Sequence, residues 1–380
     1  MTSTEMTEVR APDPVDWPTA RRIARLVAGR DPLSDSYLAA SLQADFEALT
    51  VHAEELVAEH TGLRAPGNVT ARVLDRRQWV DSNLTSMRTM LDPLMQRFGA
   101  RLVHSPLAPM SRRVAAGELG ALLGFLSQRV LGQYDLLVPD AAEPGMAGGE
   151  ARGQGTDAGV GDAVYYVGAN VLGLEKRFAF RPRDFRLWIA IHEVTHRAQF
   201  TGVPWMRAYF LGLVRQAFDL VDPDPRTVLR AVTKAVDEIR AGRNPLDDGG
   251  VVGLFASPEQ RGVLSQVQAL MSLLEGHGNV VMDDLGSRHV VGQERMSRVL
   301  QARRQQRGIT SAVHKLLGLE QKMRQYEVGE KFVRGAIALA GPNAVDAAWE
   351  APGNLPTLAE LDAPDRWLFR VSPARAGLGR

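Results

Sequence analysis

The chain contains no cysteine among its 380 residues. Disulfides, thiolate zinc sites and cysteine nucleophiles are therefore all excluded. A strong charge of one sign is also missing, because 45 Lys and Arg residues balance 44 Asp and Glu residues to a net charge of +1. Such a balance creates no long-range field that would attract nucleic acid or an anionic membrane. We therefore expect neither of them as a partner.

Long apolar runs are missing too. No stretch approaches the roughly 18 apolar residues of a helix that spans a bilayer. The first twenty residues are polar and acidic, and they lack the apolar segment of a signal peptide. The Gly-x-Ser-x-Gly pattern of many serine hydrolases is also absent. We therefore expect a cytoplasmic protein, and the sequence leaves its oligomeric state open.

What the chain does carry is the run His192-Glu193-Val194-Thr195-His196. On a helix, residues four apart stand on the same face, so both imidazoles can reach one metal ion. The pattern H-E-x-x-H is typical of zinc-metalloprotease helices, in which the Glu takes a proton from a zinc-bound water. We therefore predict Zn²⁺ as cofactor, His192 and His196 as ligands, and Glu193 as the catalytic general base.

The residues around this motif favour a buried helix. Asp184 is the expected N-cap, and Gly202 and Pro204 are stop signals at the far end. Both sides of the helix are largely apolar, so its polar side chains need partners, and a metal satisfies them well. The alternative is structural: two core histidines bonded to the backbone, with Glu193 paired to Arg197.

A catalytic zinc site usually has a third protein ligand. After the motif no His follows until His277, which excludes the H-E-x-x-H-x-x-G-x-x-H arrangement. Glu275 is the preferred candidate, because it follows an apolar run in which an unpaired charge would be costly. The alternatives are His277 as the ligand, another residue, or a helix that ends at Gly276 and leaves Glu275 solvated.

Several neighbours of Glu275 have predicted supporting roles. Asn279 and Asp283 follow it by four and eight residues, on the same helical face, and are expected to orient the histidines through the ring nitrogens that do not touch zinc. Gly276 and Gly278 are expected to let the motif helix approach closely. Three side chains are candidates to stabilise an oxyanion, and the sequence does not choose among them: Tyr209, His277 and Tyr326.

Stretches beyond the motif resemble a known family. They are Val164–Asn170, His192–Phe200 with Val203–Trp205, Leu274–Asp283, Leu317–Glu327 and Leu355–Leu361. With these stretches the chain resembles an uncharacterised bacterial family of zincin-like metallopeptidases, often labelled as associated with biosynthesis of a deazaflavin coenzyme. The resemblance implies a zincin-like fold with a helical N-terminal part, and metal ligands at His192, His196 and Glu275. It supplies no substrate, and the Gly-rich stretch after Pro144 departs from the family pattern.

Periodicity and composition predict a mainly α fold with a small β-sheet (α+β). Residues 69–80 are expected to be helical, and residues 133–139 and 164–170 to be strands. If the second strand lies at a sheet edge, it could pair with an extended peptide; an ordinary strand is the alternative. The predicted regions are a disordered arm at 1–14, a helical N-terminal region at 15–131, a zincin-like catalytic region at 132–340 with a flexible loop at 143–162, and an irregular C-terminal tail at 341–380, packed on the core by Trp349 and Trp367.

These observations predict a zinc-dependent hydrolase, in the first place a metallopeptidase that uses a zinc-activated water with Glu193 as base. Two other functions stay open. One is a metal-dependent enzyme that acts on a small molecule, and the other is a non-catalytic zincin-like protein that binds partners. Glu193 argues against the latter, because a binding scaffold has no need of a general base.

Overall fold

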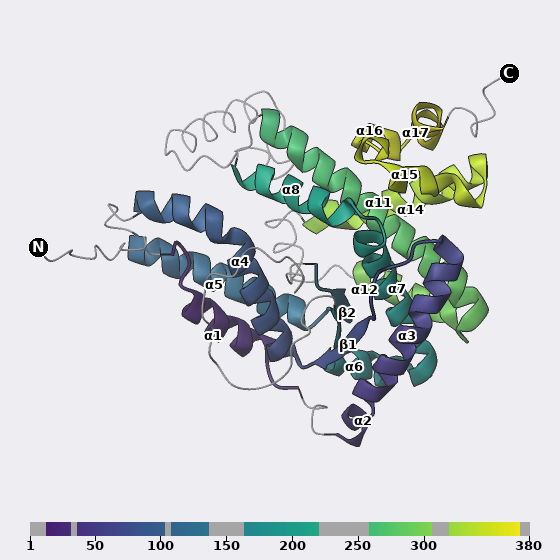
Figure 1. Ribbon diagram of the computed structural model, residues 1–380. Helices are drawn as coiled ribbons and strands as arrows, with labels where there is room; N and C mark the ends of the chain where they lie inside the picture. The colour runs from purple at the N-terminus through teal and green to yellow at the C-terminus, as the bar shows by residue number, and fades with distance from the viewer. Residues whose placement is uncertain are drawn as a thin grey trace, which may run out of the picture. The chain divides into compact units, whose positions relative to one another are not determined.

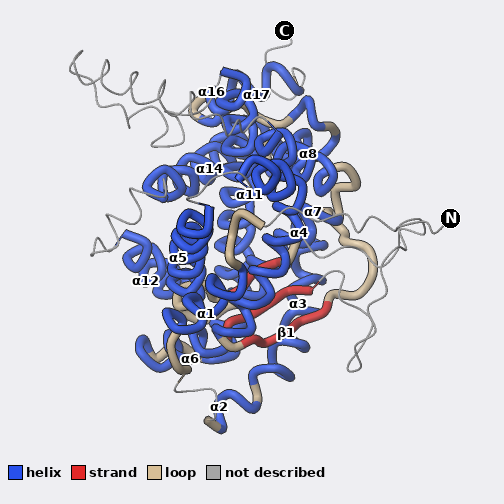
Figure 2. Tube along the Cα trace, turned by 90° about the vertical axis from the view of Figure 1, so that its left-hand side faces the viewer, coloured by secondary structure: helices blue, strands red, loops and turns tan. Residues whose placement is uncertain are grey.

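The computed structural model describes residues 13–31, 36–102, 108–136, 163–219, 258–305 and 319–372. These residues form mostly helices and one small sheet, which confirms the predicted class (Figures 1 and 2). The chain divides into two compact units, residues 1–44 with 71–177, and residues 45–70 with 178–380.

The region boundaries predicted from the sequence stay a prediction. The proposed arm at 1–14 lies outside the described residues, apart from Asp13 and Pro14. The proposed Gly-rich loop at 143–162 lies wholly outside them, as do residues 373–380 of the tail. Among the described helices, none is both long and apolar enough to cross a membrane.

Three long helices pack together in the first unit: α1 (Trp17–Ala28), α4 (Arg76–Leu102) and α5 (Ala108–Ser127). Small residues set the distance between α1 and α5. A Cβ added to Gly120 would lie 2.5 Å from the carbonyl oxygen of Ala20, and one added to Gly124 would lie 2.6 Å from that of Ala24. The two backbones are therefore close enough to exclude a larger side chain at either glycine.

The first unit also holds the sheet, which consists of β1 (Thr70–Leu74), β2 (Gly132–Tyr134) and β3 (Ala163–Val167). Its strand order is β1-β3-β2, and β2 runs antiparallel to β3 with Gln133 opposite Tyr165. The strand predicted at 164–170 is thus the central one, but it ends at Val167, and all five residues of β3 are buried. Since its neighbours occupy both of its edges, peptide pairing along this strand is excluded. The chain then enters α6 (Gly168–Phe178).

The helix predicted at 69–80 is wrong, because β1 occupies its first half and α4 begins only at Arg76. Asp75 marks the boundary. Its Oδ1 accepts from the backbone N–H of Gln78 at 2.7 Å, while Oε1 of Gln78 accepts from the N–H of Asp75 at 2.8 Å. This reciprocal pair is a capping box, a start signal that is present in the sequence as Asp-x-x-Gln. A short helix, α2 (Tyr37–Ala40), follows α1 in the first unit.

The second unit is helical and centres on α11 (Pro258–His289), which packs against α7, α8, α12 and α14. The bounds of these four partners are α7 (Pro182–Thr201), α8 (Met206–Asp219), α12 (Gln293–Gln305) and α14 (Leu319–Ala340). Another long helix is α3 (Leu42–Thr61). Because α11 continues through Gly276 and Gly278, the alternative in which a helix ends at Gly276 is wrong.

The crossing of α11 and α14 explains Gly276. A Cβ at this position would lie 2.2 Å from the carbonyl carbon of Gly329, and a Cβ at Gly329 would lie 1.8 Å from the carbonyl oxygen of Ser272. The absence of a side chain at Gly276 therefore allows α14 to pack closely. The sequence had suggested instead that this glycine lets the motif helix approach.

Gly276→Ala is expected to lower the free energy of unfolding by about 1–3 kcal/mol or more, because only rigid backbone lies opposite. Gly262 is a matched control on the same helix, with no atom within 4 Å of an added Cβ. Gly262→Ala should raise the free energy of unfolding by about 0.5–1 kcal/mol, because the unfolded chain loses freedom. Urea unfolding followed by circular dichroism measures both. A Gly276→Ala protein as stable as the wild type would contradict the close crossing.

The C-terminal tail is not irregular but consists of short helical segments. Three prolines, Pro342, Pro352 and Pro364, stand at their first turns, where a missing N–H does no harm. Trp349 and Trp367 are buried as predicted, and Nε1 of Trp367 donates to the carbonyl oxygen of Asn354 at 2.7 Å. The segments are η1 (Pro342–Asp346), α15 (Ala347–Glu350), η2 (Pro352–Asn354), α16 (Leu358–Leu361) and α17 (Pro364–Val371).

Candidate metal centre

Helix α7 carries the motif and begins earlier than the sequence suggested. Arg181 is its N-cap residue and Pro182 its first helical residue, so Asp184 lies inside the first turn. There its negative charge interacts favourably with the helix dipole. Its Oδ1 also accepts from the backbone N–H of Val291 at 3.2 Å, which fixes the start of α7 to the segment after α11. Gly202 ends the helix, as expected.

Four-residue spacing brings the two motif histidines together. The Nε2 atoms of His192 and His196 lie 3.2 Å apart, and the ring planes stand at 84° to each other. Two such nitrogens at this distance can point their lone pairs at one common position. Glu193 follows His192 directly and is buried.

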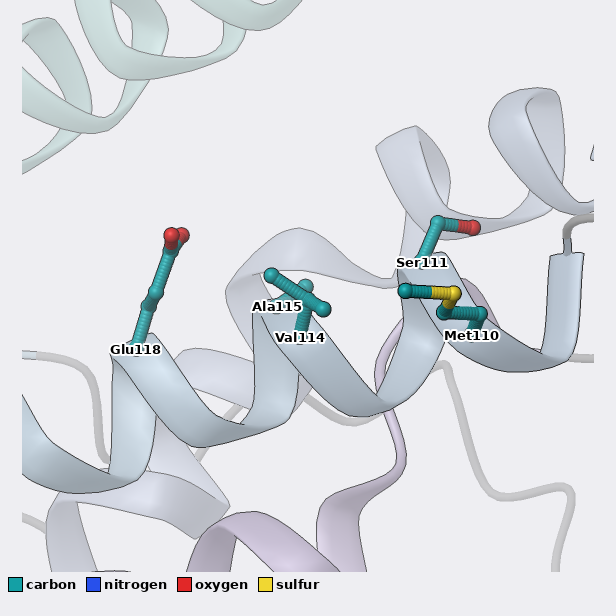
Figure 3. A pocket seen from close by; sticks show the side chains of 5 residues that line it. All are labelled: Met110, Ser111, Val114, Ala115 and Glu118. Atoms are coloured by element: carbon teal, nitrogen blue, oxygen red, sulfur yellow. The ribbon is translucent and has the colours of Figure 1, made fainter.

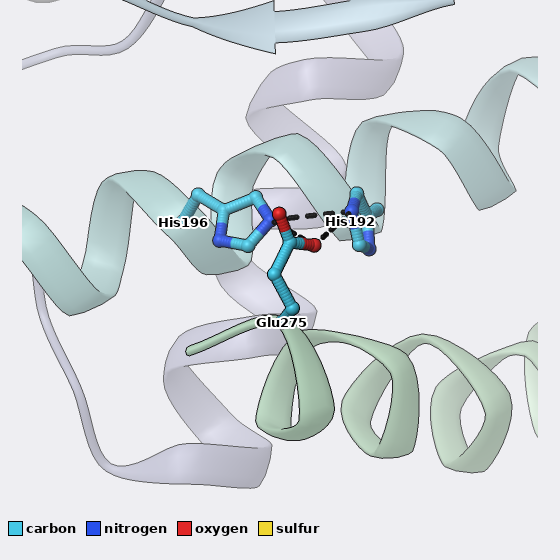
Figure 4. Close-up of side chains that lie close together, drawn as sticks. All are labelled: His192, His196 and Glu275. Atoms are coloured by element: carbon cyan, nitrogen blue, oxygen red, sulfur yellow. Dashed lines mark hydrogen bonds and ion pairs between the residues drawn. The ribbon is translucent and has the colours of Figure 1, made fainter. Parts of the chain in front are cut away.

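Glu275 on α11 faces this pair (Figure 4). Its Oε2 lies 3.8 Å from Nε2 of His192 and 3.6 Å from Nε2 of His196. Gly278 lies against the two rings, since a Cβ added there would lie 3.4 Å from Cε1 of each histidine, at the limit of ordinary van der Waals contact. The predicted role of Gly278 in close helix approach stays a prediction.

The geometry of these three donor atoms fits a zinc ion. In a tetrahedral site with ligand bonds of about 2.05 Å, neighbouring donor atoms lie roughly 3.3 Å apart. The three observed separations are 3.2, 3.6 and 3.8 Å. Two imidazoles and a carboxylate suit zinc better than Mg²⁺ or Ca²⁺, which prefer oxygen donors. Within the described part of the chain, no other trio of His, Asp and Glu side chains comes together in this way.

Gln199 supports the centre, and the sequence reasoning missed it. It lies one turn after His196, and its buried amide reaches three groups. Oε1 lies 2.9 Å from Nδ1 of His196, and Nε2 lies 3.0 Å from the carbonyl oxygen of Leu274 and 2.9 Å from Nδ1 of His277. Both the motif helix and the Glu275 helix are therefore connected through one side chain.

These contacts determine the proton on His196. The carbonyl oxygen of Leu274 can only accept a hydrogen bond, so the amide group of Gln199 that faces it must be the NH₂. Oε1 of Gln199 then faces Nδ1 of His196, which must donate. In the neutral ring, Nε2 of His196 is therefore left with the lone pair that a metal requires. The sequence signal for this role is the i+3 spacing of an amide after the second motif histidine.

Gln199→Leu is expected to weaken zinc binding by about 10- to 100-fold, because the ring of His196 loses the group that orients it. Competition with a chromogenic chelator measures the affinity. Gln293 is a matched control, since it is a buried amide that bonds to Asp283 at 2.6 Å. Gln293→Leu should leave zinc affinity unchanged. If the Gln199→Leu variant binds zinc as tightly as the Gln293→Leu variant, Gln199 does not support the metal centre.

Electrostatics makes His196 strongly basic in the metal-free protein. Burial lowers its pKa, but the hydrogen bond and charge of Glu275, with the charge of Glu193, outweigh burial and raise the pKa to about 9. A proton thus binds where we expect the metal, which indicates a local potential that attracts cations.

The free energy of unfolding of the metal-free protein should therefore depend on pH. The pKa of His196 is raised from 6.5 to about 9, so its stabilising contribution is complete below pH 6.5 and disappears as the pH rises through 9. We expect a loss of roughly 3 kcal/mol over this range. Urea unfolding at several pH values measures it, and His196→Asn should remove the dependence. A flat profile for the metal-free wild type would contradict this electrostatic account.

The other predicted residues have different surroundings. Asp283 accepts from Nε2 of Gln293 and lies 3.4 Å from Arg334, so its carboxylate interacts away from the histidines and its predicted orienting role is wrong. Burial, and then the charge of Glu330, raise its pKa. Oδ1 of Asn279 is buried with no hydrogen-bond partner among the described residues, and its role stays a prediction.

His277 does not join the trio of donor atoms. It accepts from Gln199, and its ring meets Trp349 edge to face at 5.2 Å. Burial, with the charges of His60 and His196, lowers its pKa to about 3, so the ring is neutral at pH 7. The structure therefore favours Glu275 over His277 as the third ligand.

The predicted oxyanion donors remain open. The side chain of Tyr326 lies outside the described residues. Tyr209 packs edge to face on Trp205 at 5.8 Å, and burial raises its pKa.

The guanidinium of Arg197 bonds to the carboxylate of Glu54 and, at 2.7 Å, to the carbonyl oxygen of Pro66.

Comparison with known proteins identifies a family and a similar solved structure. A family model described as zincin-like metallopeptidase matches residues 15–368. Among solved structures, the chain is similar to a protein from Chloroflexus aurantiacus described as a "putative hydrolase with a novel fold". The two proteins share 30% sequence identity, and their structures superpose with a TM-score of 0.66. The match covers 94% of this chain and 98% of the other. No curated protein matches the chain.

Proposed function

Because the chain belongs to the zincin-like metallopeptidase family, we propose that it is a zinc-dependent peptidase with its centre at His192, His196 and Glu275. The observation that carries the proposal is the convergence of these three donor atoms, each within 3.8 Å of the others, beside the buried carboxylate of Glu193. Family membership supports a metal and hydrolysis. The identity of the substrate as a peptide belongs to the proposal alone.

Each side chain has a separate task. His192 and His196 offer neutral nitrogen lone pairs, and Glu275 offers a charged oxygen that offsets part of the charge of a bound cation. Zinc at this position would lower the pKa of a water molecule toward about 7 and polarise a carbonyl group. Glu193 accepts the proton of the attacking water and delivers it to the leaving amine.

The burial of Glu193 supports catalysis over mere binding. Only 7% of this residue is exposed, and a buried carboxylate is unfavourable unless its surroundings compensate it. The negative charge of Glu193, together with that of Glu275, contributes to the raised pKa of His196. A protein that only displayed helical surfaces to partners would gain nothing from this carboxylate.

A peptide library tests the proposal. The full chain, loaded with zinc, is incubated with peptides of mixed sequence, and the products are identified by mass spectrometry. We expect internal cleavage that stops on chelation and returns with zinc. If the loaded protein cleaves no peptide but hydrolyses small amides or esters, the small-molecule alternative replaces the peptidase. The cytoplasmic location and the absence of nucleic-acid and membrane partners stay predictions.

A further inference from the structure

Two hollows in the first unit lie outside the metal centre. One follows a face of α5 (Figure 3), and two of its residues, Met110 and Val114, are 69% and 51% exposed. It holds a single carboxylate, that of Glu118, and nothing in the structure shows what covers it. The other hollow lies between α1 and α4 and has a volume of about 850 Å³.

The hollow between α1 and α4 is strongly basic. Five arginines line it, and all five are exposed: Arg21, Arg22 and Arg25 from α1, and Arg77 and Arg88 from α4. We call these residues, together with their apolar neighbours in the hollow, the α1–α4 groove. This concentration of positive charge contrasts with the net charge of +1 of the whole chain.

Internal ion pairs do not neutralise the groove. Asp81 forms ion pairs with both Arg21 and Arg25, so one carboxylate is shared by two guanidinium groups. Arg88 lies 3.5 Å from Asp13.

Arg22 and Arg77 are different, because the described residues provide neither with an ion-pair partner. Two guanidinium groups therefore remain for an external anion, and Arg offers a planar set of donors that matches a carboxylate.

The groove also has an apolar component. Leu26 is 80% exposed beside the arginines, and Trp17 and Leu84 contribute buried apolar surface. A small inorganic anion would make no use of this surface. Trp17 as a whole residue is only 9% exposed, so it offers no open ring face on which a nucleic-acid base could stack.

The length of the groove favours an extended ligand. Arg77 and Arg88 are eleven residues apart on α4, which places them about 16 Å apart along the helix axis. An extended peptide of about five residues spans this distance. A single phosphate could meet only one end of it.

We propose that the α1–α4 groove binds an extended acidic peptide, whose carboxylates pair with Arg22 and Arg77 and whose apolar side chains lie on Leu26. This proposal goes beyond the peptidase activity and does not depend on it, because it assigns a binding site in a different unit. It can therefore hold even if the metal centre has another substrate.

Fluorescence anisotropy with the full chain tests the proposal. The probe is a labelled peptide of ten residues with alternating Glu and Leu, and its neutral counterpart has Gln in place of Glu. We expect binding of the acidic probe that weakens as salt increases, and binding at least about tenfold weaker for the neutral probe. Equal binding of the two peptides would overturn the proposal.

Charge reversal locates the site. Arg22→Glu with Arg77→Glu should weaken binding of the acidic probe by at least about tenfold, because two attractions become repulsions. The matched control is Arg261→Glu with Arg298→Glu, which changes the charge equally on exposed positions of the second unit. Leu26→Ser should reduce affinity several-fold without any change of charge. Unchanged binding in the first double variant, or tighter binding of a single-stranded oligonucleotide, would refute the peptide site.

Discussion

Glu193→Gln is expected to lower kcat/KM for peptide hydrolysis by about 100- to 10,000-fold while the zinc content stays at the wild-type level. The substitution keeps the shape of the side chain but removes the group that accepts a proton. Since Glu193 is not one of the three converging donor atoms, the metal should remain bound. Loss of activity with retention of zinc separates the base from the ligands.

Steady-state kinetics and metal analysis on the same preparations measure this result. Glu294→Gln is the control, because Glu294 is exposed on α12 and its substitution makes the same change of charge. It should leave both quantities unchanged. If Glu193→Gln keeps full activity, proton transfer depends on another group and the proposed mechanism is wrong.

Glu275→Ala is expected to weaken zinc binding by about 100- to 1,000-fold, in line with the share of one ligand in the total affinity of a protein zinc site. A second consequence follows from the charges. Without Glu275, burial dominates at His196, and its pKa should fall well below its value of about 9 in the metal-free wild type. The variant should therefore lose both zinc and the basic character of His196.

Chelator competition gives the affinity, and proton NMR titration of the metal-free protein gives the pKa. Asp284→Ala is the matched control, since it removes a carboxylate from a more exposed position of the same helix. A variant at Glu275 that binds zinc as tightly as the wild type would show that another residue is the third ligand.

The convergence of the two motif histidines with Glu275 could be predicted because metal chemistry imposes its own residue spacing. The i, i+4 repeat places two imidazoles on one face wherever the helix lies, and a lone carboxylate after an apolar run is conspicuous. The position of Asp283 could not be obtained in this way. Asp283 lies on the same helical face as Glu275, but eight residues further along the helix. At that position its carboxylate contacts Gln293 and Arg334 instead.

Two other errors have identifiable causes, one local and one long-range. In residues 69–80, apolar side chains at Val69, Val73 and Val80 fit a helical period, although Asp75 and Gln78 carry a capping box that marks a later start. The partner of Gly276 could not be known from the sequence. Its contact with Gly329 joins positions more than fifty residues apart, so only the packed structure reveals it.

The role of Gln199 shows what the sequence left out. An amide three residues after His196 is unremarkable by itself, and it gains meaning only when Leu274 and His277 approach from another helix. The carbonyl oxygen then determines the orientation of the amide, and the amide determines the proton on the imidazole.

X-ray absorption at the zinc edge, on the purified full chain after zinc loading and removal of excess metal, tests the centre most directly. We expect one zinc per chain, with two imidazole nitrogens and carboxylate or water oxygens at about 2.0–2.2 Å. The imidazole signature should fall by half in His196→Ala. A chain that retains no stoichiometric zinc, or that shows no imidazole around it, would contradict the assignment of His192, His196 and Glu275 as a metal centre.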